Sequence, residues 1–573
     1  MIICYNQIMK ITRKIIFLMF LFVPLGLWAQ TSCRADKDPV LRLLSAEMKR
    51  EFPQLKKQTP PVYYLSYVVH DQKEETIEVM NGAVNYDEAK QGMWLGVFPR
   101  VGSPKMDNTR LLKNEYTNLN VKNYPIPLEA ADSKTFATAV WHATQEAVTD
   151  AQRAYSRVQT DVQTSSERLD NSDDFVFPSK ETFCQEQTFA TFDKERITRL
   201  LLKASELTKG KDFILSHYFR FTNEYGYRYF TDSVGTRIKE PYQYVRLFYE
   251  VQGRTKDGLE LRRFESYDVL DEKQLPAEEQ FLAAVAQAIV QLKEQLDAPE
   301  AEPIAVPVIL KNRAMGVFVH EVLGHRVEGH RQKDDDFGRT FTDKVGHPIT
   351  APFITIVDDP TLSYFNGEPL RGFYHYDSEG VKGKPATLVE NGVLKGFMMS
   401  SSPIKGFSVS NGHGRAQRGR RAVARMSNTR LISSQTVPYE ELEKMLLEEV
   451  KKQGKPYGVI VEDIEGGFAI TQTALPQAFN LAPTLMYRLY PDGRKEIVRG
   501  LHLAGMPLSS FREVMATADD YDIFNGSCGA ESGWVPVSAI APSTLLRTVE
   551  LEKASKNSQR LPLLPPPSDE EKL

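Results

Sequence analysis

The chain has 573 residues, of which 41% are hydrophobic and 25% are charged, and this composition is typical of a soluble globular protein with two or three domains. The formal net charge is −4, from 71 basic and 75 acidic residues. The chain therefore lacks the basic excess that a dedicated nucleic-acid binder would carry.

The N-terminus has the pattern of a secretory signal. Basic residues precede the apolar run 15–29, which is short for a membrane-spanning helix and contains a proline. We predict that residues 1–29 are a cleaved signal peptide and that the protein is exported, to the periplasm or the medium. Cys33 leaves a second possibility, a lipoprotein anchored at this residue, although "QTSC" lacks the usual apolar residue three positions earlier. No later segment is apolar for long enough to span a bilayer.

The region that follows, residues 38–298, mixes helical and strand patterns. Apolar residues at helical spacing predict helices, and runs of aromatic and β-branched residues predict strands. The predicted helices are 38–52, 133–160, 191–208 and 277–296, and the predicted strands are 60–71, 75–86, 213–233 and 242–264. The polar stretch 165–175 is predicted to be a loop. We therefore expect an N-terminal α/β domain.

The proline-rich stretch 296–308 is the best candidate for a domain boundary. Beyond it, helical patterns are scarce apart from the motif described below and residues 438–453. Hairpin turns are predicted at Asn391-Gly392 and Asp492-Gly493. Residues 305–550 therefore form a mostly β domain in our prediction, so that the fold class is α+β. The last residues, 555–573, are predicted to be a disordered tail.

The second domain opens with the motif "HEVLGH", in which His320 is followed by Glu321 and, five residues on, by His325. Two imidazoles can hold a zinc ion that makes a bound water acidic, and a neighbouring carboxylate can accept the proton. Five residues turn a regular helix by roughly 500°, which leaves the two rings about 140° apart. We therefore expect a wider, π-type turn, which Gly324 would permit because glycine tolerates unusual backbone angles.

A third protein ligand is needed, and the residues alone leave three candidates. Glu328 and His330 follow the motif, and Cys528 lies far away in "NGSCGAESGW". A thiolate binds zinc well and would keep Cys528 out of a disulfide. Glu328 is better suited to orienting a ligand, and His330 is predicted to be an exposed polar residue rather than a ligand.

Cysteine and arginine patterns raise two further questions. Three cysteines remain after signal cleavage, so at least one is unpaired within the chain; Cys33 and Cys184 can form a disulfide or stay as two free thiols. Five arginines lie within Arg415–Arg425. This segment is either an anion site, for a peptide carboxylate or an acidic surface, or a solvated loop, and the solvated loop is the simpler reading.

These motifs resemble the TldD/PmbA family of zinc metallopeptidases. The resemblance includes "HEVLGH", the pair Cys528-Gly529, a hairpin-like stretch over 375–400, and the segments "NGHGRAQ" and "RMSNTRL" in the same order. It extends well over about 300–550 and loosely over the first domain. The acidic "RQKDDDFG", the arginine-rich segment and "AESGW" depart from the family pattern, as does the predicted export.

The resemblance implies that His320, His325 and Cys528 bind Zn²⁺ and that Glu321 is the catalytic base. It also implies an N-terminal α/β domain followed by a mostly antiparallel, barrel-like metallopeptidase domain. The expected function is hydrolysis of peptide bonds in unfolded peptides or small proteins. The expected assembly is a homodimer, or a heterodimer with a TldD/PmbA-type subunit, without nucleic acid.

The alternative is a non-catalytic subunit that binds peptides or supports a partner enzyme through a structural metal. A closed site with Glu328 or His330 as fourth ligand would favour this alternative, whereas an open position favours the enzyme.

Overall fold

The computed structural model describes residues 31–112, 119–127, 133–164, 170–333, 340–471 and 478–556. The predicted signal peptide, 1–29, lies outside these residues, as does nearly all of the predicted tail 555–573. Among the described residues, none of the helices combines the length and the apolar character needed to cross a membrane.

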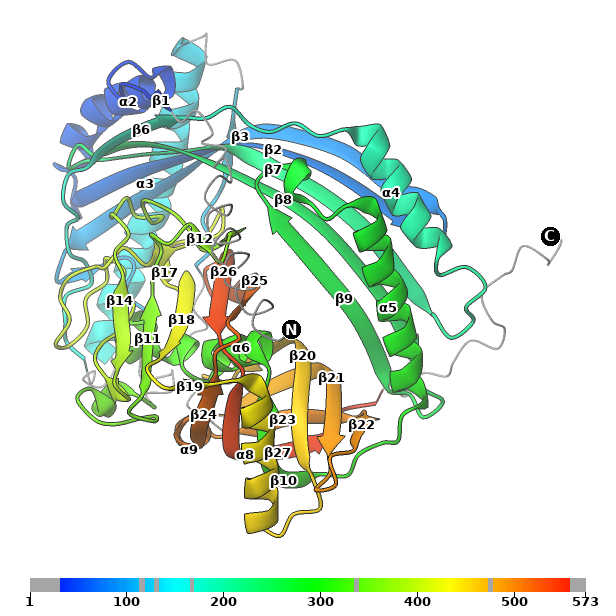
Figure 1. The fold of residues 1–573 in the computed structure, drawn as a ribbon. Helices are drawn as coiled ribbons and strands as arrows, with labels where there is room; N and C mark the ends of the chain where they lie inside the picture. Colours follow the sequence, from blue (N-terminus) through cyan, green and yellow to red (C-terminus); the bar gives the residue numbers. More distant parts are fainter. Residues whose placement is uncertain are drawn as a thin grey trace, which may run out of the picture.

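The N-terminal half is built on one nine-stranded sheet. Its strands are β1 (Thr31–Ser32), β2 (Val62–Met80), β3 (Ala83–Ser103), β4 (Met106–Asp107), β5 (Tyr124–Ile126), β6 (Thr182–Glu186), β7 (Ser216–Asp232), β8 (Arg237–Arg254) and β9 (Glu260–Val269). They pair in the order β1-β6-β8-β7-β2-β3-β4, with β5 on β3 and β9 on β8. Figure 1 shows the long strands arching over the C-terminal half.

Two strand predictions in this sheet were wrong because each crossed a turn. The predicted strand 75–86 contains Asn81 and Gly82, which both have positive φ (52° and 76°) and join β2 to β3. An Asn-Gly pair in this conformation is the preferred two-residue hairpin turn. Similarly, the predicted strand 242–264 is divided into β8 and β9 by a turn at Gly258, where φ is 92°.

The predicted helices of this half are present as α2 (Pro39–Leu55), α3 (Ser133–Thr164), α4 (Lys194–Glu206) and α5 (Glu278–Asp297), with a short 3₁₀ turn η1 (Glu272–Gln274). Asp38 begins α2 by accepting a hydrogen bond from the backbone N–H of Leu41 at 2.9 Å. Because side chains alternate along a strand, Leu65, Tyr67 and Val69 of β2 face the α2 and α3 core. The residues between them face the C-terminal half.

The C-terminal half contains two larger sheets. The first comprises β10 (Ile304–Leu310), β19 (Thr436–Val437), β20 (Gly458–Ala469), β21 (Phe479–Leu489), β22 (Lys495–Val498), β23 (Leu501–Gly505), β24 (Val514–Ala518) and β27 (Thr544–Lys553). Strands β10, β20, β21, β23 and β27 pair in sequence, and β27 pairs back to β10. They therefore close a five-stranded barrel, and the expected α+β fold with a barrel-like second domain is confirmed.

The second sheet has the order β15-β14-β11-β18-β26-β25. Its strands are β11 (Ile354–Asp358), β14 (Ala386–Glu390), β15 (Val393–Leu394), β18 (Asn428–Ser433), β25 (Asp522–Ala530) and β26 (Gly533–Ala541). Short pairs are formed by β12 (Tyr364–Phe365) with β13 (Glu368–Pro369) and by β16 (Gly414–Arg415) with β17 (Val423–Ala424). The predicted turn at Asn391-Gly392 joins β14 to β15, with positive φ at both residues (49° and 80°).

Helices are few and short in this half: α6 (Asn312–Val322), α7 (His330–Lys333), α8 (Tyr439–Lys452) and α9 (Pro507–Arg512), with 3₁₀ turns η2 (Gly324–Val327) and η3 (Thr342–Lys344). The helix α6 contacts β20 of the barrel and β25 and β26 of the second sheet. A Cβ on Gly316 would lie 3.1 Å from the carbonyl oxygen of Ala539 in β26. Glycine at this position therefore allows α6 to approach the sheet closely, and this approach brings the end of α6 near β25.

Candidate metal centre

The two histidines of the motif lie on either side of a break in the helix. His320 belongs to α6, which ends at Val322, and His325 belongs to the 3₁₀ turn η2. Between them, Leu323 has φ −110° and ψ −53°. The ring centroids of the histidines are 5.0 Å apart, at an interplanar angle of 89°. The predicted π-type turn was wrong: the chain leaves the α-helix instead, and this change of direction brings both rings to one side.

Gly324 is needed for a reason other than the one that we predicted. Its φ is not in the left-handed region, so its backbone conformation is open to other residues. A Cβ at this position would lie 2.0 Å from Sδ of Met426. Glycine therefore makes room for the Met426 side chain, which packs against the turn that carries His325.

The third member of the cluster is Cys528, which comes from β25, an edge strand of the second sheet. Its Sγ lies 3.1 Å from Nε2 of His320 and 3.4 Å from Nε2 of His325. All three side chains are buried, and their ligand atoms lie within 4.8 Å of one another. Two imidazole nitrogens and one sulfur are a donor set that suits zinc.

Glu321 lies beside this cluster, with Oε2 at 4.0 Å from Nε2 of His325. The side chain is buried, and Oε2 has no hydrogen-bond partner among the residues that the structure describes. Burial raises the pKa of Glu321, because removal from water disfavours the charged carboxylate. A buried carboxylate oxygen without a protein partner is available to a water or a substrate.

Glu328 binds the other side of the same histidine. Its carboxylate lies 3.3 Å from Nδ1 of His325 and accepts a hydrogen bond from Nε of Arg331 at 2.8 Å. Arg425 is 3.3 Å away through its Nε. Burial alone would raise the pKa of Glu328, but His325 and the two arginines lower it to about 2. This is the arrangement of a group that orients a ligand, because the carboxylate holds the ring nitrogen opposite the cluster.

Arg425 connects Glu328 to the cysteine. It is fully buried, and its Nη2 donates to the carbonyl oxygen of Cys528 at 2.7 Å and to Sγ at 3.1 Å. Burial alone would raise the pKa of the Cys528 thiol, but the two histidines and Arg425 hold it well below its usual range. These neighbours favour the thiolate over the thiol, and the thiolate is the form that binds metals.

His330 was predicted to be exposed, and this prediction was wrong. The side chain is buried, with Nε2 at 3.7 Å from Oε1 of Glu531. Glu531 was not recognised as a functional residue, although "AESGW" departs from the family pattern. It forms a buried ion pair with Arg331 and so extends the network around Glu328. Neither His330 nor Glu531 belongs to the group of three ligand atoms.

The arginine-rich segment is not a solvated loop. Arg415 and Arg425 are buried, and Arg415 donates a hydrogen bond to the carbonyl oxygen of Met426. Arg418 stacks on Trp94 of β3, with its guanidinium carbon 3.8 Å from the ring centroid, and donates to Gln72 at 2.9 Å. The segment therefore connects the metal centre to the concave face of the N-terminal sheet.

A buried His-His-Cys cluster lies beside a carboxylate oxygen that accepts no hydrogen bond from the described residues, in an α+β fold with a barrel. These features define a candidate metallohydrolase. Comparison with known proteins assigns residues 303–553 to the family described as PmbA/TldA metallopeptidase C-terminal domain. This match covers the C-terminal half of the chain, and the curated relatives that resemble the same part are named metalloproteases or TldD homologues.

Individual relatives support this assignment. A metalloprotease of Methanocaldococcus jannaschii is 31% identical over 231 residues, which are 40% of this chain and 47% of that protein. A zinc metalloprotease TldD homologue of Saccharolobus solfataricus is 27% identical over 43% of this chain and 51% of that protein. The matched part thus spans about half the length of these relatives. The crystal structure of TldE from Thermococcus kodakarensis shares the fold, with a TM-score of 0.56, 14% identity and coverage of 90% of this chain and all of that chain.

Proposed function

We propose that the protein is a zinc-dependent metallopeptidase that hydrolyses peptide bonds in unfolded peptides or small proteins. The observation that carries the proposal is the convergence of His320, His325 and Cys528, from two distant parts of the chain, beside the buried carboxylate of Glu321. The name of the S. solfataricus relative, a zinc metalloprotease, supports zinc as the metal.

His320, His325 and Cys528 would hold the ion. Zinc bound to this set would act as a Lewis acid that makes a bound water acidic near neutral pH. The thiolate and the two imidazoles fit the preference of zinc for nitrogen and sulfur ligands. Glu328 keeps His325 oriented, and Arg425 stabilises the charge on Sγ of Cys528, so that the ligands are held in place before any metal arrives.

Glu321 is the catalytic base in this proposal. Its Oε2, which has no partner among the described residues, accepts a proton from the attacking water and returns it to the leaving amine. Arg326 holds the backbone of Glu321 in place: its buried side chain donates a hydrogen bond to the carbonyl oxygen of Glu321 at 2.7 Å. The end of α6 is therefore fixed even though the helix is broken just beyond it.

The strand β20 offers an edge for an extended peptide. It pairs with β10 only over Val459–Val461, so that Asp463–Ala469 pair with β21 alone within the described residues. This free edge runs beside the base, because a Cβ on Gly467 would lie 2.9 Å from Cγ of Glu321. Backbone pairing along the edge would hold a substrate extended with little dependence on its side chains.

The alternative, a non-catalytic subunit with a structural metal, is less well supported. A fourth protein ligand would be required, yet Glu328 binds the far nitrogen of His325 and His330 lies beside Glu531. The likeness to TldE supports an assembly with a TldD/PmbA-type partner. We propose a homodimer or such a heterodimer, with unfolded peptide as the substrate.

We also propose that the mature protein is exported. The disulfide between Cys33 and Cys184 supports export, because disulfides persist in oxidising compartments. The same bond uses the sulfur to which a lipid would be attached, so that it favours a soluble form over a lipoprotein anchored at Cys33.

Metal analysis and peptide cleavage test the proposal together. Protein without residues 1–29 should contain about one zinc per chain and cleave an unfolded peptide library in a chelator-sensitive way. Glu321→Gln should retain zinc and lose about 10²–10⁴-fold in turnover, the usual contribution of a positioned acid–base group. Glu440→Gln, on the exposed face of α8, is the matched control. Full turnover by Glu321→Gln, or a zinc-loaded wild type that cleaves no peptide even with its partner present, would refute the proposal.

A further inference from the structure

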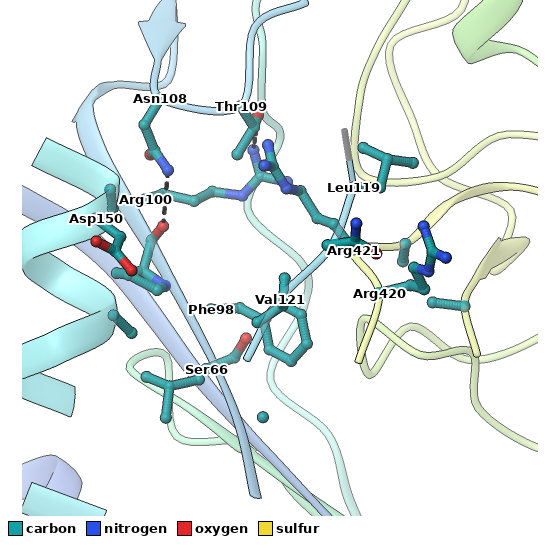
Figure 2. A pocket seen from close by; sticks show the side chains of 18 of the residues that line it. Ser66, Phe98, Arg100, Asn108, Thr109, Leu119, Val121, Asp150, Arg420 and Arg421 are labelled. Atoms are coloured by element: carbon teal, nitrogen blue, oxygen red, sulfur yellow. Dashed lines mark hydrogen bonds between the residues drawn. The ribbon is translucent and has the colours of Figure 1, made fainter. Parts of the chain in front are cut away.

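A cavity of about 360 Å³ lies between the N-terminal sheet and the arginine-rich segment. Its walls come from β2, β3, α3 and residues 416–422, and we call it the basic pocket. Figure 2 shows Arg100 entering from the sheet and Arg420 and Arg421 from the opposite wall. Its volume is within the range of ligand sites in proteins.

Positive charge dominates this pocket. Of the described residues that line it, seven are arginine or lysine and two, Asp150 and Glu379, are acidic. Several of the cations are already paired: Arg100, for example, lies 2.9 Å from Asp107. The side chain of Arg421 makes no hydrogen bond or ion pair with any residue that the structure describes.

Arg421 and Arg100 approach each other from opposite walls, as Figure 2 shows. Burial and the charge of Arg100 lower the pKa of Arg421 to about 10, against an opposing effect of the Asp107 carboxylate, so that the guanidinium still carries its charge at neutral pH. Asp107 compensates the charge of Arg100, so Arg421 is the one of these two arginines whose side chain has no hydrogen bond or ion pair among the described residues, and an anion beside it would be favoured. A guanidinium offers two parallel N–H donors, which match a carboxylate.

The basic pocket adjoins a second cavity that reaches residues beside the metal centre. This second cavity, of about 60 Å³, shares Arg100 and Arg421 with the basic pocket and reaches His330 and Glu531. Glu531 is paired with Arg331, which binds Glu328, the carboxylate on His325. Neither cavity is lined by His320, Glu321, His325 or Cys528, so the basic pocket lies beside the metal centre and is linked to it through these side chains.

We propose that the basic pocket binds an acidic side chain of the peptide substrate, several residues away from the bond that is cleaved. This inference rests on the proposed peptidase function and adds a preference for substrates with aspartate or glutamate. Apolar groups line the same pocket, including Phe98, Leu119 and Val121. A carboxylate on a hydrocarbon stem suits this mixture of apolar and basic walls better than a free, fully hydrated anion does.

Binding without cleavage tests the inference. The zinc-loaded Glu321→Gln protein is titrated with two fluorescent unfolded peptides that differ only in carrying glutamate or glutamine at matched positions. The glutamate peptide should bind about tenfold more tightly or better, the effect of one charge-assisted hydrogen bond. Adding Arg421→Gln should remove this advantage without changing the affinity for the glutamine peptide.

Three further variants make the result specific. Arg421→Lys should retain part of the preference because it keeps the charge, and Arg420→Gln should weaken it. Arg199→Gln, an exposed arginine of α4 outside the pocket, should change nothing. Zinc content and circular dichroism show that each variant is folded; if Arg421→Gln does not fold, Arg421→Lys and Arg420→Gln decide the question.

Equal affinity for the two peptides, or a preference that survives these substitutions, would overturn the inference. If the enzyme cleaves both peptides equally well, only the proposal that the basic pocket binds acidic side chains is refuted. Specific binding of the glutamate peptide by a protein that cleaves nothing would instead refute the peptidase function. The two proposals can therefore fail separately.

Discussion

Nη2 of Arg425 donates a hydrogen bond to Sγ of Cys528 at 3.1 Å, and Nε of the same guanidinium lies 3.3 Å from Glu328. One buried arginine thus contacts both Cys528, a member of the candidate metal centre, and Glu328, which binds His325 of the same centre. Both anions are buried, so their charges need this compensation.

We expect Arg425→Gln to lower the free energy of unfolding by about 3–5 kcal/mol, because it leaves buried charges uncompensated. Urea denaturation of the metal-free protein measures this change. Arg494→Gln, at an exposed arginine, should stay within about 0.5 kcal/mol of wild type. Similar stabilities of the two variants would show that Arg425 does not neutralise the site.

Glu328→Gln should reduce zinc affinity about 10–100-fold, since the carboxylate that orients His325 and increases the basicity of its ring is lost. Competition with a chromophoric chelator measures the affinity. Glu448→Gln, exposed on α8, serves as the control. If folded Glu328→Gln protein binds zinc as tightly as wild type, the carboxylate does not act through His325.

Gly324→Ala should destabilise the protein by about 1–3 kcal/mol, because the added methyl group would lie 2.0 Å from Sδ of Met426. Met426→Ala alone should also destabilise, by leaving a cavity. The double variant should lose less than the sum of the two, since the shortened side chain makes room for the methyl group. Strictly additive losses in thermal unfolding would indicate that the two residues do not compete for space.

Protein purified without reductant should be lighter by two hydrogen atoms than the reduced form, because Cys33 is bonded to Cys184. Alkylation after unfolding should then label Cys528 alone. Replacing Cys33 and Cys184 by serine should cost about 2–5 kcal/mol of stability, since the bond joins residues 151 positions apart. A lipid on Cys33 would contradict this prediction, because its sulfur would already be used.

The elements that were predicted well from the sequence are those that depend on residues close together in the chain. The helices α2, α3, α4 and α5 have apolar stripes at helical spacing, and the turn at Asn391-Gly392 depends on two adjacent residues. The ends of strands were predicted poorly. Asn81-Gly82 is a typical turn pair, yet the predicted strand 75–86 ran across it. The closure of the barrel depends on pairing between β10 and β27, which are far apart in the chain, and only the family resemblance indicated it.

The motif and the resemblance were enough to predict that His320, His325 and Cys528 lie together, as they do in the structure, and their role as metal ligands stays a prediction. The surroundings of this cluster were not predicted. The local pattern around Arg425 is that of a charged loop, and its burial depends on Cys528 and Glu328, which fold onto it from other segments. Glu531 was missed for the same reason, since its partner Arg331 is 200 residues away. The five-residue spacing indicated correctly that the helix is irregular, but not that it ends.

The bond between Cys33 and Cys184 has a consequence for the distant metal centre. Each of these sulfurs is occupied by the other, so that Cys528 is the one free cysteine in the part of the chain that the structure describes. In an oxidising compartment, a free Cys33 or Cys184 could form a non-native disulfide with Cys528, and Cys528 would then no longer be a thiolate. Because the disulfide occupies the other two sulfurs, Cys528 would stay available as a ligand for the proposed ion.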